Sequence, residues 1–219
     1  MTAIDVKWFE RCHAAGLIKG RFLEVGSAKV DGGENLCDIA RKLGAEDVVG
    51  VDLAPCDGVD HLVDFGVPEA GFADAWQLGL FDTVCVFNVL EHTFDPITVL
   101  LNCLACVRPG GFLLACTPSV WPIHNYPRDY NRMLPDWYRE FALRSHAELR
   151  NEDFCWLSPF GIEGIGSDTD LPGWLTRGRE ASPGRYWGSK IFHKLFNTYG
   201  RSHWATHSAI GAPFRKSDC

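Results

Sequence analysis

The sequence predicts an α/β fold in which helices cover both faces of an open, mostly parallel sheet. Short apolar runs rich in β-branched residues alternate with amphipathic helical segments between residues 21 and 118. One run, FDTVCVFNVL, is too apolar for a strand with one face in water, which is typical of a central parallel strand. With 219 residues, 46% of them hydrophobic, we expect a single doubly wound domain.

A helix is predicted before the sheet begins. Its apolar residues recur at helical spacing at Ile4, Trp8, Cys12 and Ala15. The runs RFLEV and DVVGVDL then read as short strands. The segment ENLCDIARKLG between them places its apolar residues on one helix face and ends on Gly44. The sheet therefore starts with a strand, helix, strand unit.

The alternation continues to residue 118. HLVDF is a brief strand, PEAGFADAWQLG a helix, and FDTVCVFNVL the central strand. In DPITVLLNCLACV, Asp95 is the predicted N-cap and Pro96 the first helical residue, and GFLLACTP supplies one more buried strand. From Ser119 the sequence is dense in Pro, Trp, Tyr, Arg and Gly and has few periodic apolar runs. In this part a helix is predicted over 136–146 and late strands in NEDFCWLSPF and HSAIGAPFRK.

Composition excludes several classes of protein. The net charge of −7 argues against a nucleic-acid duplex as the main partner, since neutralising phosphates needs clustered Lys and Arg. The nine cysteines lack the paired spacing of a zinc site, and Cys103 and Cys106 lie in an apolar helical run, so we expect buried thiols and no metal. No apolar run reaches eighteen residues, and charges interrupt the first residues, so we expect a cytoplasmic protein without a membrane partner.

The stretch FLEVGSAKVDGGEN reads as a ligand cradle. Gly26 follows the strand directly, and glycines 32 and 33 precede the next helix, whose N-terminus favours an anionic group. Glu24 would repel the phosphates of a dinucleotide but suits the sulfonium and ammonium of S-adenosylmethionine. Asp52, at the end of VVGVDL, can accept the hydroxyls of an adenosine ribose. The two acids predict a site for a cationic adenosyl cofactor.

FLEVGS, VVGVDL, FDTVCVFNVLEH and VRPGGFLLACTP together resemble the class I S-adenosylmethionine-dependent methyltransferases, particularly the small-molecule branch, over residues 22–141. The resemblance implies a seven-stranded, Rossmann-like sheet, with residues 1–118 as the cofactor-binding core and 119–219 as a substrate cap plus final strands. It implies that Glu24, Gly26 and Ser27 hold the methionine part of the cofactor. By the same resemblance Asp52 binds ribose, Leu53 packs on adenine, Asp64 meets the adenine amine, and Asn88 and Val89 flank the cofactor. Ala28 replaces the family's second glycine.

HNYPRDYNRMLP resembles a segment of bacterial methyltransferases associated with glycan and secondary-metabolite pathways, although Met133 and Leu134 replace its Phe and Thr. The segment follows the fifth strand and so leaves the sheet on the cofactor side. We predict that it binds the acceptor through Tyr126, Arg128, Asp129, Tyr130 and Arg132. For proton removal we predict His124 first and then His92 of the EH pair.

The predicted function is methyl transfer to an oxygen, or a nitrogen, of a small molecule such as a sugar, a glycan precursor or a secondary metabolite. Three alternatives stay open: a methyltransferase acting on RNA or protein, a dinucleotide-dependent oxidoreductase of similar fold, and a binding protein without catalysis. The oligomeric state is also left open.

Overall fold

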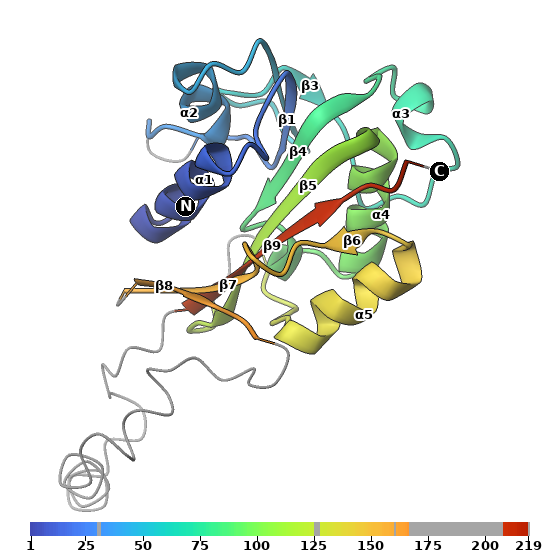
Figure 1. The fold of residues 1–219 in the computed structure, drawn as a ribbon. Helices are drawn as coiled ribbons and strands as arrows, with labels where there is room; N and C mark the ends of the chain where they lie inside the picture. Colours follow the sequence, from blue (N-terminus) through green and yellow to red (C-terminus); the bar gives the residue numbers. More distant parts are fainter. Residues whose placement is uncertain (30–31, 125–127, 160, 167–207, 219) are drawn as a thin grey trace, which may run out of the picture.

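The computed structural model describes residues 1–29, 32–124, 128–159, 161–166 and 208–218. Its centre is a sheet with the strand order β3-β2-β1-β4-β5-β9-β7-β8, and β6 pairs with β9 (Figure 1). The first five strands pair in parallel. They are β1 (Arg21–Val25), β2 (Asp47–Asp52), β3 (His61–Leu62), β4 (Phe81–Phe87) and β5 (Val107–Val120).

The other strands extend the sheet in antiparallel fashion. They are β6 (Glu148–Leu149), β7 (Cys155–Ser158), β8 (Gly161–Gly164) and β9 (Ser208–Arg215). The two late strands predicted from the sequence are confirmed as β7 and β9, which pair with each other and, for β9, with β5. The described residues thus form nine strands where we expected seven, because β6 and β8 are short and carry no alternating apolar pattern.

Helices cover both faces, which confirms the doubly wound arrangement. They are α1 (Ala3–Ala14), α2 (Leu36–Lys42), α3 (Phe72–Ala75), α4 (Pro96–Cys106) and α5 (Pro135–Ser145), with a 3₁₀ turn η1 (Leu90–His92). Successive residues of a strand point to opposite faces: Leu113 of β5 packs in the core with α3, α4 and α5, while Leu114 packs in the core with α1 and α2.

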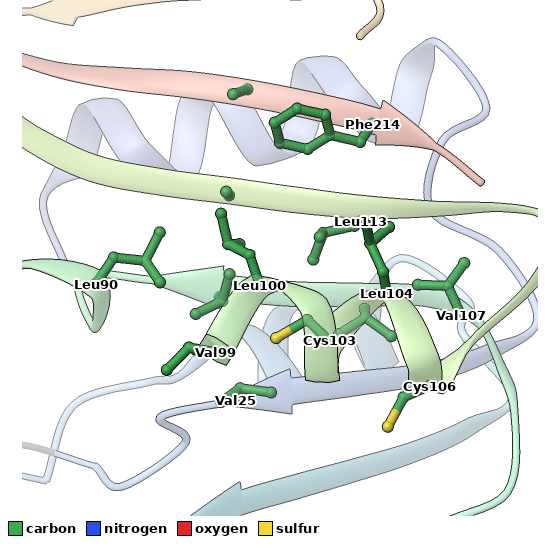
Figure 2. Packing of buried hydrophobic residues seen from close by; sticks show 14 of the residues in the cluster. Val25, Leu90, Val99, Leu100, Cys103, Leu104, Cys106, Val107, Leu113 and Phe214 are labelled. Atoms are coloured by element: carbon green, nitrogen blue, oxygen red, sulfur yellow. The ribbon is translucent and has the colours of Figure 1, made fainter. Parts of the chain in front are cut away.

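Helix α4 begins where the sequence predicts. The Asp95 carboxylate accepts from the N–H groups of Ile97 (3.1 Å) and Thr98 (3.2 Å), and Pro96 opens the helix. Leu100 and Cys103 of α4 pack in one core with Leu113 of β5 and Phe214 of β9 (Figure 2). Cys103 and Cys106 are buried free thiols, as predicted, and burial raises the pKa of Cys106 to about 12.

The helix predicted over PEAGFADAWQLG is shorter than expected. Gly71, at φ +66°, precedes α3, and Gln77, at φ +55°, follows it. Left-handed backbone at both ends confines the regular helix to Phe72–Ala75.

Helix α1 is held against the antiparallel part of the sheet. Trp8 is fully buried, and its Nε1 donates to the carbonyl oxygen of Asp153 (3.1 Å). Gly211 of β9 makes room for it, because a Cβ there would lie 2.3 Å from Trp8 Cε2. This packing fixes the N-terminus of α1 beside the cavity described below. Within the residues described, no helix is long and apolar enough to cross a membrane.

Candidate active site

A cavity of about 770 Å³ opens at the carboxyl ends of the parallel strands. This is where an open α/β sheet binds its ligands. Residues from the N-terminus of α1 and from the segments after β1, β2, β3, β4 and β5 line it. Among the residues predicted from the sequence, the structure brings together in this lining Gly26, Asp52, Leu53, Asp64, Asn88, Val89, His92 and His124.

Gly26 forms the floor of the cradle. Its φ is +84°, and its N–H donates to the carbonyl oxygen of Val51 (2.9 Å), an acceptor shared with the N–H of Ser27 (3.1 Å). A Cβ on Gly26 would lie 2.3 Å from Cγ2 of Val89, which crosses above it. Both the backbone angle and the close approach therefore require glycine here.

Asp52 stands at the rim of the cavity, at the end of β2. Its carboxylate accepts from the N–H groups of Ala28 (3.1 Å) and Leu53 (2.7 Å). Ala28, which stands where the family has a glycine, thus contributes through its backbone. Each carboxylate oxygen has two lone pairs, so Asp52 can still accept from a ligand. Leu53 is 70% exposed beside it, an apolar surface open to a ring.

Glu24 and Ser27 lie behind the cavity and are not part of its lining. The Glu24 carboxylate accepts from the N–H groups of Leu36 (3.1 Å) and Cys37 (2.7 Å), the first residues of α2. Burial raises the pKa of Glu24 to about 7. Ser27 is fully buried, and its carbonyl oxygen accepts from Asn35 Nδ2 (2.8 Å). Because the Glu24 carboxylate and the Ser27 backbone are hydrogen-bonded within the protein, these two residues support the loop from behind the cavity.

Sequence reasoning missed Asp5 of α1 as a lining residue. Thr2 and Asp5 form a reciprocal cap: Thr2 N–H donates to Asp5 Oδ2 (2.7 Å) and Asp5 N–H to Thr2 Oγ1 (3.4 Å). Asn88, at φ +54°, donates from Nδ2 to Asp5 Oδ2 (3.3 Å). The T-x-x-D pattern could have located the helix start, but nothing local in the sequence shows that this start meets the end of β4.

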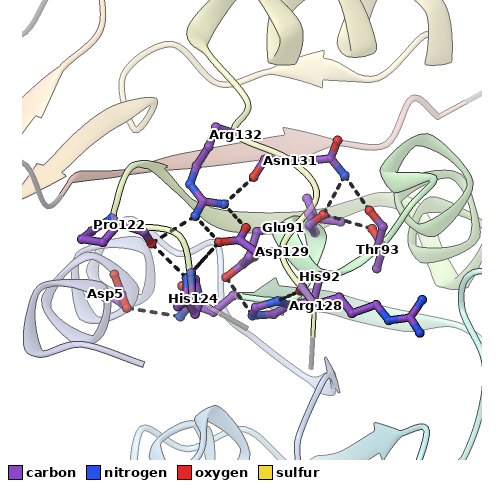
Figure 3. Close-up of polar contacts among 12 residues, drawn as sticks. Asp5, Glu91, His92, Thr93, Pro122, His124, Arg128, Asp129, Asn131 and Arg132 are labelled. Carbon is purple, nitrogen blue, oxygen red and sulfur yellow. Dashed lines mark hydrogen bonds and ion pairs between the residues drawn. The ribbon is translucent and has the colours of Figure 1, made fainter. Parts of the chain in front are cut away.

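The turn η1 holds the segment that follows β5 (Figure 3). The carbonyl oxygen of Glu91 accepts from the N–H of Tyr130 (2.7 Å), and the carbonyl oxygen of Thr93 from Asn131 Nδ2 (2.5 Å). His92 Nδ1 hydrogen-bonds the carbonyl oxygen of Arg128. These contacts bring His124 beside His92, with ring centroids 4.9 Å apart.

Asp129 and Arg132 organise this segment and do not line the cavity, contrary to the predicted contact with the acceptor. Asp129, its side chain 3% exposed, pairs with the Arg132 guanidinium, which holds the pKa of Asp129 at about 2. The same carboxylate accepts from the N–H of His124 (2.8 Å) and lies 3.3 Å from its Nδ1. The Asp129 oxygens are thus used in orienting His124 (Figure 3).

The structure does not place the other predicted acceptor-binding residues, Arg128, Tyr130 and Tyr126, in the described lining of the cavity. Arg128 Nη1 donates to the Tyr130 hydroxyl (3.3 Å), and the Tyr130 ring meets Phe94 edge to face, with centroids 5.9 Å apart. Neither Arg128 nor Tyr130 lines the cavity. Tyr126 is outside the residues described.

Glu91 is a second residue that the sequence did not assign to the site. Its side chain borders the cavity, is 0% exposed, and lies 3.7 Å from His92 Nε2. Burial raises the pKa of Glu91 to about 7. The EH pair is therefore a buried carboxyl beside a half-buried imidazole.

The lining is acidic. It contains the carboxyl groups of Asp5, Asp52, Asp64, Glu91 and Asp95. The described lining includes neither Lys nor Arg. Such a cavity attracts cations and disfavours phosphates. Its donors and acceptors fit a ligand that carries a sulfonium, an ammonium and a ribose.

Comparison with known proteins also indicates a methyltransferase. Residues 7–170 match the family model described as a methyltransferase domain. The chain is 32% identical over 161 residues to a ubiquinone biosynthesis O-methyltransferase of Xanthomonas oryzae, covering 63% of this chain and 65% of the relative. The matched region thus spans less than two thirds of that relative's length.

Two solved structures share the fold. One is the Burkholderia thailandensis 1,6-didemethyltoxoflavin-N1-methyltransferase with bound S-adenosylhomocysteine (TM-score 0.58, 12% identity, 99% of this chain and 79% of the other). Another is a Haemonchus contortus phosphoethanolamine N-methyltransferase in complex with S-adenosyl-L-methionine (TM-score 0.54, 16% identity, 97% and 52%). The family match over residues 7–170 shows that this chain belongs to the methyltransferase-domain family, and the two solved structures that share its fold were determined in complex with S-adenosyl-L-methionine and with S-adenosylhomocysteine.

Proposed function

We propose that this protein transfers a methyl group from S-adenosylmethionine to a hydroxyl oxygen of a small molecule. The observation that carries the proposal is the acidic cavity at the strand ends, with a glycine cradle at one side and two imidazoles at the other. The relatives named O-methyltransferases support oxygen as the receiving atom.

At the cradle, Gly26 lets the Val89 side chain pack directly against the backbone, and both residues line the cavity where the cofactor would lie. Asp52, oriented by its two backbone donors, is placed to accept the ribose hydroxyls. Leu53 offers the exposed apolar surface against which the adenine would pack. Asp64 and Asn88 also line the cavity.

The cofactor, when bound, supplies a methyl group on a positively charged sulfur. The chain's own task is to hold the acceptor oxygen in line with that methyl and to exclude water. Positioning of this kind lowers a barrier by about 7 kcal/mol or more. The acidic lining favours the cationic cofactor over a dinucleotide, whose pyrophosphate would meet carboxylates and no Lys or Arg in the described lining.

A hydroxyl must also lose its proton, which accounts for roughly 10² to 10⁴-fold in rate. His124 and then His92 are the groups we assign to that proton. Both line the cavity, and each has its Nδ1 near a fixed acceptor, the Asp129 carboxylate for His124 and the Arg128 carbonyl for His92. The Asp129–His124 pair keeps the His124 ring in one orientation.

The acceptor is small in this proposal, because about 770 Å³ lies within the range of small-molecule sites and must also hold the cofactor. Sugars, phenols and other hydroxylated metabolites fit this description, and a small amine is the second candidate. The location in the cytoplasm and the absence of nucleic-acid partners stay predictions from the sequence.

The test is methyl transfer from S-[methyl-³H]adenosylmethionine to panels of hydroxylated sugars, phenols, small amines, RNA and protein. We expect labelled small hydroxyl compounds and release of S-adenosylhomocysteine. Transfer to RNA or protein alone would contradict the proposal. Cofactor binding without transfer to any acceptor would favour a protein that has kept the fold without the catalysis.

A further inference from the structure

The Glu91 carboxyl group is buried without a hydrogen-bond partner. It is 0% exposed, and neither Oε1 nor Oε2 has a partner among the residues described. His92 Nε2 lies 3.7 Å from Glu91 Oε1, too far for a hydrogen bond. A buried carboxylate without partners is costly, so a ligand that supplies them would bind here.

Two imidazoles lie beside the Glu91 carboxyl group, and each has its Nδ1 next to a hydrogen-bond acceptor. His92 Nδ1 is bonded to the carbonyl oxygen of Arg128, and His124 Nδ1 lies 3.3 Å from Asp129 Oδ2 and 3.3 Å from the carbonyl oxygen of Pro122. Because these neighbours are acceptors, they favour a proton on each Nδ1 and leave each Nε2 with its lone pair. Metal-binding histidines are held in this way by a carbonyl or carboxylate.

We propose that Glu91, His92 and His124 bind one divalent transition-metal ion. One ligand atom from each side chain lies within 4.8 Å of the others. Around a tetrahedral ion, ligand atoms about 2.1 Å from the metal lie roughly 3.4 Å apart, so each pair of ligand atoms must approach by at most about 1.4 Å. Two imidazoles and a carboxylate suit Zn²⁺, Co²⁺, Fe²⁺ or Mn²⁺ better than Mg²⁺, which prefers oxygen.

Asp129 and Arg132 support the set from behind. The Arg132 guanidinium pairs with Asp129, and Asp129 in turn contacts both the backbone and the ring of His124. The cysteine spacing gave no sign of this site, because its ligands come from η1 and from the segment after β5 (Figure 3).

The role of the ion rests on the proposed function. Three protein ligands leave a position for the acceptor hydroxyl, whose pKa a bound divalent cation lowers. The hydroxyl proton passes to solvent, the oxygen forms a bond to the methyl carbon, and the carbon–sulfur bond breaks to leave a neutral thioether. When the ion is bound, His124 and His92 serve as its ligands, and they promote loss of the proton through the ion and do not accept it themselves.

The test is titration of the chelator-treated chain with Co²⁺, followed by visible absorption, and with Zn²⁺, followed by calorimetry. We expect one equivalent in the wild type and affinity weakened about 100-fold or more in Glu91→Gln and His124→Ala. His146→Asn is the matched control, because His146 is exposed at the end of α5. Cys56→Ser removes the exposed thiol of the described residues, and circular dichroism checks that each variant is folded.

No stoichiometric binding in the wild type would overturn the metal proposal, as would equal affinity in wild type, Glu91→Gln and His124→Ala. Because His124 lies in a surface segment, His124→Ala keeps the test valid if Glu91→Gln fails to fold. S-adenosylhomocysteine binding is measured on the same samples. If the protein binds S-adenosylhomocysteine but no metal, only the metal proposal is overturned. If it binds the metal but transfers a methyl group to no acceptor, the proposed function is overturned.

Discussion

Replacing Gly26 with alanine tests the cradle directly. At φ +84° an L-residue is strained by about 1–2 kcal/mol. The new Cβ would also lie 2.3 Å from Val89 Cγ2, and overfilling a packed site costs about 1–3 kcal/mol. We therefore expect Gly26→Ala to lower the free energy of unfolding by about 2–5 kcal/mol, and to weaken binding of S-adenosylhomocysteine because Val89, which lines the cavity, must move to make room for the methyl group.

A double-mutant cycle with Val89→Ala separates the two contributions. Val89→Ala removes the methyl group with which the new Cβ would clash. The double variant should therefore keep the cost of the strained backbone but not the cost of the clash, which gives a coupling free energy of about 1–3 kcal/mol. Urea denaturation followed by circular dichroism gives the free energies of unfolding, and calorimetry gives the affinity. Strictly additive effects, or a Gly26→Ala variant as stable as the wild type, would refute the reasoning.

Three further predictions concern side chains of the site. Asp52→Asn should weaken S-adenosylhomocysteine binding about 10–100-fold by calorimetry, because charged hydrogen bonds to ribose contribute about 1.5–3 kcal/mol, whereas Asp74→Asn, at an exposed residue of α3, should not; equal affinities of wild type and Asp52→Asn would show that Asp52 does not bind ribose. Burial raises the pKa of Glu24 to about 7, above its value in the unfolded chain, so the folded state binds the proton more tightly. This proton contributes to the free energy of unfolding fully below about pH 4.5, and the contribution is lost as the pH rises through 7. Relative to Glu24→Gln, the wild type should lose about 2–3 kcal/mol of unfolding free energy between about pH 5 and pH 8 in urea titrations, and a constant difference would contradict the burial argument. His124→Ala should lower turnover about 10²–10⁴-fold with cofactor affinity unchanged, while His146→Asn keeps both; full turnover in His124→Ala would remove that residue from the mechanism.

Local sequence signals predicted most of the fold. Asp95 and Pro96 marked the start of α4, and the continuous apolar run over β4 indicated a strand covered on both faces. What escaped prediction depends on backbone angles and partners that a short window does not contain. The left-handed residues Gly71 and Gln77 shorten α3, and β6 becomes a strand only because β9 lies beside it.

Some residues of the candidate site could likewise be predicted from the sequence, and others could not. Gly26 and Asp52 were predictable because each follows directly from the end of a strand, and the structure places both in the cavity lining. The sequence could not predict whether an acidic side chain points into the cavity or away from it. The Glu24 carboxylate binds the N-terminus of α2, and the Asp129 carboxylate contacts Arg132 and His124. Glu91 gave no sign of its buried, unpartnered carboxyl, because that state arises from packing between η1 and segments distant in sequence.

The central claim is that the carboxyl ends of the parallel strands form a site for an adenosyl sulfonium. Calorimetric titration of the purified chain with S-adenosylmethionine, and with NAD⁺ in parallel, tests it most directly. The acidic lining predicts saturable binding of one S-adenosylmethionine per chain and no measurable binding of NAD⁺. Binding of NAD⁺ in preference to S-adenosylmethionine, or binding of neither, would contradict the claim.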